Sequence, residues 1–206
     1  MLTLGHSTLP IDVFLGVLAD NGVRLVADIR TIPQSRHNPQ SGQDSLSSSL
    51  RQASLEYCWL SALGGLRKLQ KDLLPLNAGW RNASFRGSAD SMQTAALSSA
   101  VQELLALAER SSVVLLCAEA VPWRCHRSLV ADALSVRGIA VQHIFHGKGG
   151  ASHRRSHQLT PFARVEGTRI WYPAEDSLFR EDPPPGDEFL PGTKKARPRR
   201  LSGGRV

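Results

Sequence analysis

The stretch SVVLLCAE, residues 112–119, constrains the fold more than any other, because apolar residues follow one another in it almost without interruption. A strand of this kind suits burial on both faces, as in the centre of a parallel sheet. Other short β-like runs, LTLG, VRLVADIR, SLEYCWL and IAVQHIF, alternate with helical patterns. We therefore expect an α/β protein whose mostly parallel sheet carries helices on both faces.

Start and stop signals place the helices between these strands. Thr8 is expected to cap the first helix, with Pro10 in its first position and Gly22 just beyond its end. Apolar residues at helical spacing predict a second helix from Ser88 to Arg110, and a third runs from Arg127 to Arg137.

The C-terminal part carries weaker signals. Residues 147–158 have the composition of a glycine-rich basic loop, and residues 168–173, TRIWYP, suit an edge strand. A chain of 206 residues is long enough for one substantial core. We expect a single domain over residues 1–180, followed by a flexible Pro/Gly-rich and then basic tail over residues 181–206.

The net charge of +7 is concentrated at the C-terminal end. Residues 193–206 contain six basic residues and no acidic one, which leaves 19 basic against 18 acidic residues in the remainder. A basic tail of this kind either binds phosphates of a nucleic acid or only keeps the protein in solution.

Composition excludes two classes of protein. No apolar run approaches the length of a membrane span, and no basic-then-apolar signal region begins the chain, so no membrane association is expected. Three cysteines, an odd number, do not make a disulfide framework and favour a reducing, cytoplasmic location.

Polar and ionisable residues follow the predicted strands at their carboxyl ends. In chain order, these residues are Gly5, His6 and Ser7; Asp28, Arg30, Pro33 and Ser35; Cys117, Glu119, Cys125, His126 and Arg127; and His143 and His146. Ligands of parallel sheets bind outside the carboxyl ends of the strands, where the strand order switches. The sequence therefore predicts a site at this edge of the sheet.

The segment CAEAVPWRCHR, residues 117–127, allows several interpretations. We favour an anion site in which the free N–H groups of a helix beginning at CHRS face the cleft and lower the pKa of a nearby cysteine. Cys117 or Cys125 is then the thiolate, and Glu119 and His126 are proton-transfer groups. Substrate-binding roles fall to a second set of residues: His6, Ser7, Asp28, Arg30, Ser35 and Arg127.

Three other interpretations concern the same segment. A phosphatase- or rhodanese-type loop separates cysteine and arginine by five residues, whereas six lie between Cys117 and Arg124, and Pro122 removes one N–H donor. A zinc deaminase needs a further cysteine and a different spacing. A metal site at Cys117, Cys125 and His126, with His6 or His157 as a further ligand, has ligand types that suit zinc or iron, but adjacent helical residues diverge by about 100°.

Five motifs in order resemble those of a prokaryotic family grouped as domain of unknown function 488. The motifs are TLGHST, LVADIRTIPQSR, LEYCWLSALGG, VVLLCAE with CHRSLVADAL, and VQHI, and the resemblance extends over about residues 2–173. It implies a small single-domain α/β protein with no assigned activity. The positions that match its polar motifs coincide with the strand-end residues above, except that they include His157 and do not include His146. The segment NPQSGQ departs from the aromatic-asparagine pair of the family.

Two hypotheses of function follow. The first is an enzyme acting on an anionic, phosphate-bearing substrate such as a nucleotide or nucleic acid, by thiol-dependent or acid–base chemistry. The second is a non-catalytic nucleotide- or nucleic-acid-binding protein that uses the same groups to bind phosphate. The motifs name neither a cofactor nor an oligomeric state.

Overall fold

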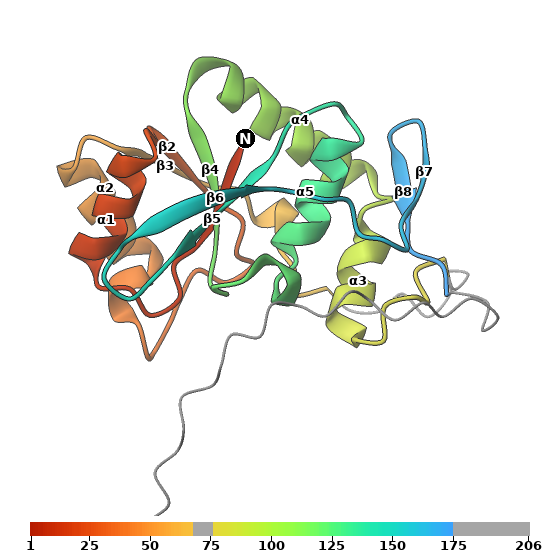
Figure 1. Cartoon of the computed structure of the whole chain (residues 1–206), viewed down its shortest axis with the longest axis horizontal. Coiled ribbons are helices and arrows are strands. Elements are labelled where there is room, and N and C mark those ends of the chain that lie inside the picture. The colour runs from red at the N-terminus through yellow and green to blue at the C-terminus, as the bar shows by residue number, and fades with distance from the viewer. Residues whose placement is uncertain (68–75, 175–206) are drawn as a thin grey trace, which may run out of the picture. The chain divides into compact units, whose positions relative to one another are not determined.

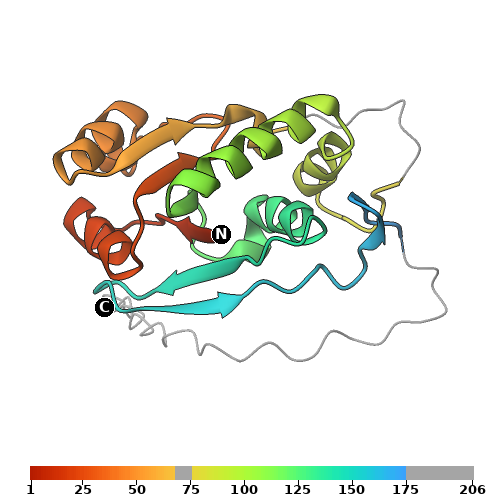
Figure 2. The same cartoon turned by 90° about the horizontal axis from the view of Figure 1, so that it is seen from above.

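The computed structural model describes residues 1–67 and 76–174, which belong to one compact unit. Six strands form a sheet in the order β3–β2–β4–β1–β5–β6 (Figures 1 and 2). The strands are β1 (Leu2–Gly5), β2 (Leu25–Asp28), β3 (Glu56–Trp59), β4 (Val113–Cys117), β5 (Gln142–His146) and β6 (Ser152–Ser156). Only β6 runs antiparallel to its neighbour. The predicted α/β fold with a mostly parallel sheet is confirmed.

Helices cover both faces of this sheet. Figure 1 shows α1 (Ile11–Asp20) and α2 (Gln43–Gln52) on one side, and α4 (Ala95–Arg110) and α5 (Arg127–Ser135) on the other. Alternate residues of β4 point to the two sides: Val114 and Leu116 pack with α1 and α2, whereas Leu115 and Cys117 pack with α4 and α5. Burial on both faces is the physical reason for the unbroken apolar run in this strand.

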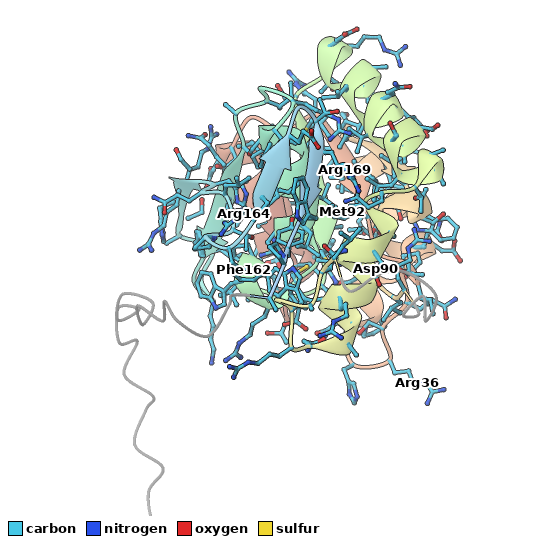
Figure 3. The ribbon with its side chains drawn as sticks, turned by 90° about the vertical axis from the view of Figure 1, so that its right-hand side faces the viewer. Arg36, Asp90, Met92, Phe162, Arg164 and Arg169 are labelled. Atoms are coloured by element: carbon cyan, nitrogen blue, oxygen red, sulfur yellow. The ribbon has the colours of Figure 1, made fainter. Side chains whose placement is uncertain are left out.

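A third cluster lies beside α5. Helix α3 (Ala83–Ser91) lies near the hairpin of β7 (Arg164–Glu166) and β8 (Arg169–Trp171) (Figure 3). The buried side chains of Ala89, Leu129, Ile170 and Tyr172 pack together in this cluster. Strand β8 pairs with β7 in a sheet of its own. The prediction of an edge strand within residues 168–173 is therefore confirmed, although this strand belongs to a two-stranded sheet apart from the six-stranded one.

Two predicted helix boundaries are wrong. The segment from Ser88 to Arg110 contains the end of α3 and the whole of α4, because the Thr94 side chain accepts a hydrogen bond from the backbone N–H of Leu97 and starts a new helix. Helix α1 begins at Ile11 without a side-chain cap from Thr8.

Strand β6 occupies part of the segment that was expected to be a basic loop. His153, Arg154 and Arg155 are exposed on this edge strand. Charged residues are common on edge strands because they discourage pairing with a further strand, so composition alone does not distinguish such a strand from a loop. Within the described part of the chain, no helix is long and apolar enough to cross a membrane.

The strand order opens a crevice at one place. Strands β1 and β4 are hydrogen-bonded neighbours, yet α1 after β1 covers one face and α5 after β4 covers the other. The two connecting loops therefore diverge at the carboxyl ends of these strands. This is the type of switch point at which α/β sheets bind ligands.

The domain boundary predicted near residue 180 and the basic segment at residues 193–206 lie outside the described residues. Both remain predictions.

Candidate active site

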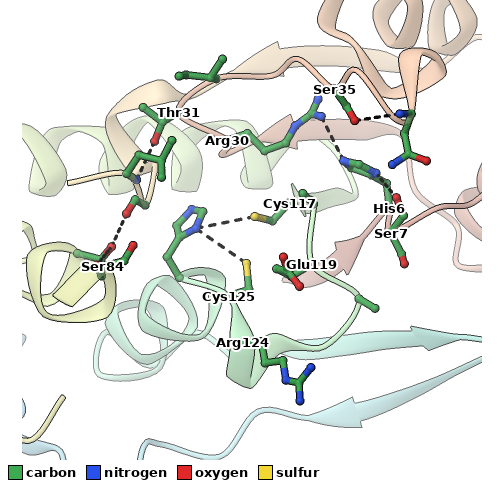
Figure 4. Close-up of a pocket in the computed structure, with 18 of the residues that line it drawn as sticks. His6, Ser7, Arg30, Thr31, Ser35, Ser84, Cys117, Glu119, Arg124 and Cys125 are labelled. Atoms are coloured by element: carbon green, nitrogen blue, oxygen red, sulfur yellow. Dashed lines mark hydrogen bonds between the residues drawn. The ribbon is translucent and has the colours of Figure 1, made fainter. Parts of the chain in front are cut away.

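A cavity of about 580 Å³ lies at the carboxyl ends of β1, β2 and β4. Its walls come from the end of β1, the loop after β2, helix α3 and the loop after β4 (Figure 4). Eight of the ten residues to which the sequence analysis gave a role line it: His6, Ser7, Arg30, Ser35, Cys117, Glu119, Cys125 and His126. Asp28 and Arg127 are fully buried behind this wall.

Two cysteines and a histidine converge at one end of the cavity. The Nδ1 atom of His126 lies 3.8 Å from the Sγ atom of Cys117 and 3.9 Å from the Sγ atom of Cys125 (Figure 4). All three atoms lie within 4.8 Å of one another. Among the described residues, this is the one group of three or more His, Cys, Asp or Glu side chains close enough to share a metal ion.

The backbone before α5 explains how adjacent residues reach the same point. Cys125 is extended, with φ −135° and ψ 139°, because it follows a short 3₁₀ turn at Pro122–Arg124, and His126 is the N-cap of α5. The divergence of about 100° applies only to neighbours that are both inside a helix. The geometric objection to joint metal binding by Cys125 and His126 is therefore wrong.

The hydrogen bond of the His126 ring fixes its tautomer. Its Nε2 atom lies 3.0 Å from the carbonyl oxygen of Ile29, and a carbonyl only accepts, so Nε2 carries the proton. In the neutral ring, Nδ1 then presents a lone pair toward the two sulfur atoms. A histidine whose other nitrogen donates to a backbone carbonyl is typical of a metal ligand.

The two sulfur atoms differ in acidity. A hydrogen bond from Cys125 lowers the pKa of Cys117, against the effect of burial, and the Arg127 charge and the backbone N–H groups of Ala118 and Glu119 lower it further. The same pairing, together with burial, raises the pKa of Cys125. Cys117 is therefore the first of the pair to ionise.

A second group of residues lies across the cavity. The Arg30 guanidinium pairs with the buried Asp28 carboxylate, and its Nη1 atom donates to the carbonyl of Ser41 and to Nε2 of His6. Burial and the Arg30 charge lower the pKa of His6 to about 4. His6 is thus neutral, with its proton on Nδ1 and donated to the carbonyl of Ser7. Asp28 orients Arg30 and does not reach the cavity itself.

Arg127 does not face the cavity. Its guanidinium donates to the carbonyl oxygens of Glu119 and Ala120, and thus holds the loop after β4. The first N–H groups of α5 are also occupied, since Arg127 N donates to Cys125 Sγ at 3.5 Å and Ser128 N donates to the Cys125 carbonyl. We expected the first N–H groups of this helix to be free to bind an anion. Those of Arg127 and Ser128 instead donate to Cys125.

Two glycines allow the walls of the site to approach each other. A Cβ atom on Gly5 would lie 1.7 Å from the carbonyl oxygen of Glu119, and one on Gly65 would lie 2.3 Å from Cγ of His126. A side chain at either position would displace the loop after β4 or the His126 ring.

The histidines near β5 belong to a different arrangement. Asp132 of α5 accepts hydrogen bonds from His157, Thr160 and Tyr172, and His157 contacts His143 at 2.9 Å. His146 contacts the Gly5 carbonyl instead. None of the three histidines lines the cavity.

Sequence reasoning missed several residues of the cavity wall. The missed residues include Thr31, Gly65, Leu66, Ser84 and Ser88, whereas Arg124, which lines the cavity, was expected as an alternative to Arg127 for the charge of the anion site. Gly65 ends the motif LEYCWLSALGG, which was the available signal. Ser84 and Ser88 come from α3, and no local pattern indicates that this helix closes the site.

Comparison with known proteins adds one finding. The family model with the description "Domain of unknown function DUF488" matches residues 10–134. This range contains eight of the predicted site residues, while His6 and Ser7 precede it. No curated protein and no solved structure matches.

Proposed function

Because the chain belongs to the DUF488 family, whose description assigns no activity, we propose its function from the cavity itself: an enzyme that acts on an anionic, phosphate-bearing substrate. The observation that carries this proposal is the convergence of Cys117, Cys125 and His126 in a cavity that also contains two arginines. Clusters of nucleophilic and ionisable groups in a cavity at a switch point are typical of active sites.

An arginine without a partner in the described part of the chain favours an anionic substrate. Arg30 and Arg124 line the cavity, and Glu119 is the one carboxylate among its described lining residues. The charge of Arg30 is already compensated by the buried Asp28, so the argument depends on Arg124. The Arg124 side chain is exposed and makes no hydrogen bond or ion pair within residues 1–67 and 76–174. Its guanidinium is therefore available to a phosphate, for which arginine offers a pair of parallel N–H groups.

Hydroxyl groups complete the polar wall. Ser7, Thr31, Ser35 and Ser84 line the cavity beside the charged residues. Such groups donate to phosphate or sugar oxygens without adding charge. A cavity of about 580 Å³ has the size of a small-molecule site and suits a mononucleotide or a sugar phosphate.

The reactive groups divide into two kinds. Cys117, the first of the pair to ionise, supplies the thiolate, and His126 Nδ1 is positioned to exchange a proton with sulfur, since its Nε2 is bonded to Ile29. Glu119 is exposed two residues after Cys117 and is the proton-transfer group that can reach a bound substrate.

Binding measurements with a matched pair of variants test the charge assignment. Inorganic phosphate and nucleoside monophosphates are titrated calorimetrically into wild type, Arg124→Gln and Arg24→Gln, the last an exposed arginine outside the cavity. Loss of a charge-assisted contact should weaken binding about tenfold or more in Arg124→Gln, with no change in Arg24→Gln. Equal binding by all three proteins would contradict the proposal.

Turnover separates an enzyme from a binding protein. A panel of phosphate esters is assayed with wild type and with Cys117→Ser, which retains the shape of the side chain. The proposal expects turnover by wild type, and unchanged phosphate binding but no turnover by the variant. Binding without turnover of any ester would favour the non-catalytic alternative.

A specific surface favours that alternative as the second candidate. Trp123 is 61% exposed and lies 5.9 Å from the Phe145 ring, which His153 stacks on and Arg155 covers. Aromatic rings interleaved with arginine are typical of surfaces that stack single-stranded nucleic acid. The affinity for a labelled single-stranded oligonucleotide, measured by fluorescence anisotropy, should then be lower for Trp123→Ala than for wild type. Equal binding by both proteins would exclude this function.

A further inference from the structure

The arrangement of two sulfurs around one imidazole nitrogen calls for an explanation beyond hydrogen bonding. His126 Nδ1 is almost equidistant from the sulfur atoms of Cys117 and Cys125, at 3.8 and 3.9 Å. A neutral ring has one lone pair on this atom and accepts one hydrogen bond, so it has no reason to face both thiols. A cation placed among the three atoms would be bonded by all of them.

The separations match a tetrahedral zinc site. Zinc binds cysteine sulfur at about 2.3 Å and histidine nitrogen at about 2.0–2.1 Å, which at a tetrahedral angle places sulfur and nitrogen about 3.6 Å apart. The observed sulfur–nitrogen separations are larger by a few tenths of an ångström, and the two sulfur atoms lie within 4.8 Å of each other, whereas two Zn–S bonds at a tetrahedral angle place them about 3.8 Å apart. Binding therefore requires the Cys117 and Cys125 side chains to move toward each other as well as toward His126.

We propose that Cys117, Cys125 and His126 bind one zinc ion through two thiolates and one imidazole nitrogen, with the fourth coordination position open to the cavity. Binding releases the two thiol protons to solvent, and two thiolates neutralise the charge of the ion. Three protein ligands with an open position are typical of catalytic zinc sites, whereas structural sites have four.

The surroundings hold the ligands in place. The Ile29 carbonyl accepts a hydrogen bond from the Nε2–H group of His126, and the Arg127 backbone N–H donates one to Cys125 Sγ. Gly65 packs directly against the His126 ring. Such second contacts orient ligands and typically change metal affinity 10- to 100-fold when they are lost.

Soft ligands select the ion. Two thiolates and an imidazole favour zinc over magnesium or calcium, which prefer oxygen ligands. The open position lies in the same cavity as Glu119 and Arg124. It would take a water molecule or an oxygen of an anionic substrate. With the ion bound, Cys117, Cys125 and His126 act as its ligands, and Glu119 remains the proton-transfer group. The inference thus deepens the proposed function and rests on it only for the role of the ion, since zinc binding is measured without a substrate.

The third cysteine provides a matched control. Cys58 lies on β3 and is half-buried outside the cluster, and burial raises its pKa to about 11. The untagged wild type, Cys58→Ser, Cys117→Ser and Cys125→Ser are loaded with zinc, dialysed and analysed for metal by mass spectrometry. We expect about one zinc per chain in wild type and Cys58→Ser, and a loss of at least tenfold in affinity in the other two.

Two further measurements on wild type do not depend on the folding of a variant. Cobalt(II) in place of zinc should give thiolate charge-transfer absorption and the intense visible bands of a tetrahedral site. Zinc should also protect Cys117 and Cys125 from alkylation, as mapped by peptide mass spectrometry, relative to metal-free protein. No zinc in wild type, an equal loss in Cys58→Ser, an octahedral cobalt spectrum or a Cys117–Cys125 disulfide would each overturn the inference. A wild-type protein that takes up no zinc but still turns over phosphate esters would overturn it while leaving the proposed function intact.

Discussion

Single residues decide whether the loop after β4 forms a site. Cys125 reaches the cavity only because its backbone is extended, and His126 keeps its ring there only because residue 65 has no side chain. The sequence predicted the residue types Cys117, Glu119, Cys125 and His126 from their place after the central strand. It gave no sign of the contact with Gly65, which comes from a segment more than fifty residues away in the chain.

Gly65→Ala is the mildest test of this contact. The added Cβ atom would lie 2.4 Å from His126 Nδ1, so the ring must move away from the two sulfurs. We expect zinc affinity to fall about 10- to 100-fold, as for loss of a supporting contact. Gly16→Ala is the control, because nothing lies within 4 Å of its Cβ position on the exposed side of α1; it should leave zinc affinity unchanged and stabilise the helix by about 0.5–1 kcal/mol. Unchanged zinc binding in Gly65→Ala would contradict this account.

His143 makes folding sensitive to mild acid. Burial, followed by the charges of His157 and Arg127, lowers its pKa to about 4, although Asp132 acts in the opposite direction. In the unfolded chain the usual pKa is about 6.5, so between pH 6.5 and 4 the unfolded state binds a proton that the folded state excludes. The free energy of unfolding should therefore fall as the pH drops through this window.

The comparison with His143→Gln isolates this contribution. Over the same pH range, the slope of the unfolding free energy against pH should be smaller in the variant by up to about one bound proton. Denaturant unfolding at several pH values measures it. Parallel slopes for the two proteins would show that His143 does not titrate in this way.

At the scale of elements, the sequence predicted most of what the sheet contains. The five parallel strands and α1 and α5 were expected because their apolar periods and glycine stops are local signals. The division between α3 and α4 was missed because an apolar period continues across Thr94, which starts a new helix. Strand β6 was missed because its composition does not indicate a strand. It forms one because it pairs with β5.

Asp132 joins elements that would otherwise be attached only by the chain. Its buried carboxylate on α5 accepts from His157 after β6, from Thr160, and from Tyr172 after β8. Asp132→Asn places an amide N–H₂ against these donors, and we expect a loss of about 3 kcal/mol in the free energy of unfolding. The exposed Asp20→Asn should stay within about 0.5 kcal/mol of wild type in the same guanidinium titration. Equal stability of the two variants would refute this role.

At the scale of the whole molecule, the strand order carries the functional argument. Strands β1 and β4 are adjacent although more than a hundred residues separate them, and their loops diverge to opposite faces. The alternation of strands and helices predicted the fold class, and the placement of polar residues after strands predicted the edge at which they meet. The order β3–β2–β4–β1–β5–β6 itself depends on long-range pairing that no local pattern specifies.

The most direct test of the central claim is X-ray absorption at the zinc edge of the purified, zinc-loaded protein. The claim is that the loop after β4 brings Cys117, Cys125 and His126 to one reactive centre in the cavity. The account predicts a shell of two sulfur atoms at about 2.3 Å and nitrogen or oxygen atoms at about 2.0–2.1 Å, with imidazole scattering from one histidine. In Cys58→Ser the same spectrum is expected. A shell of nitrogen and oxygen atoms alone, or one sulfur in place of two, would contradict the account.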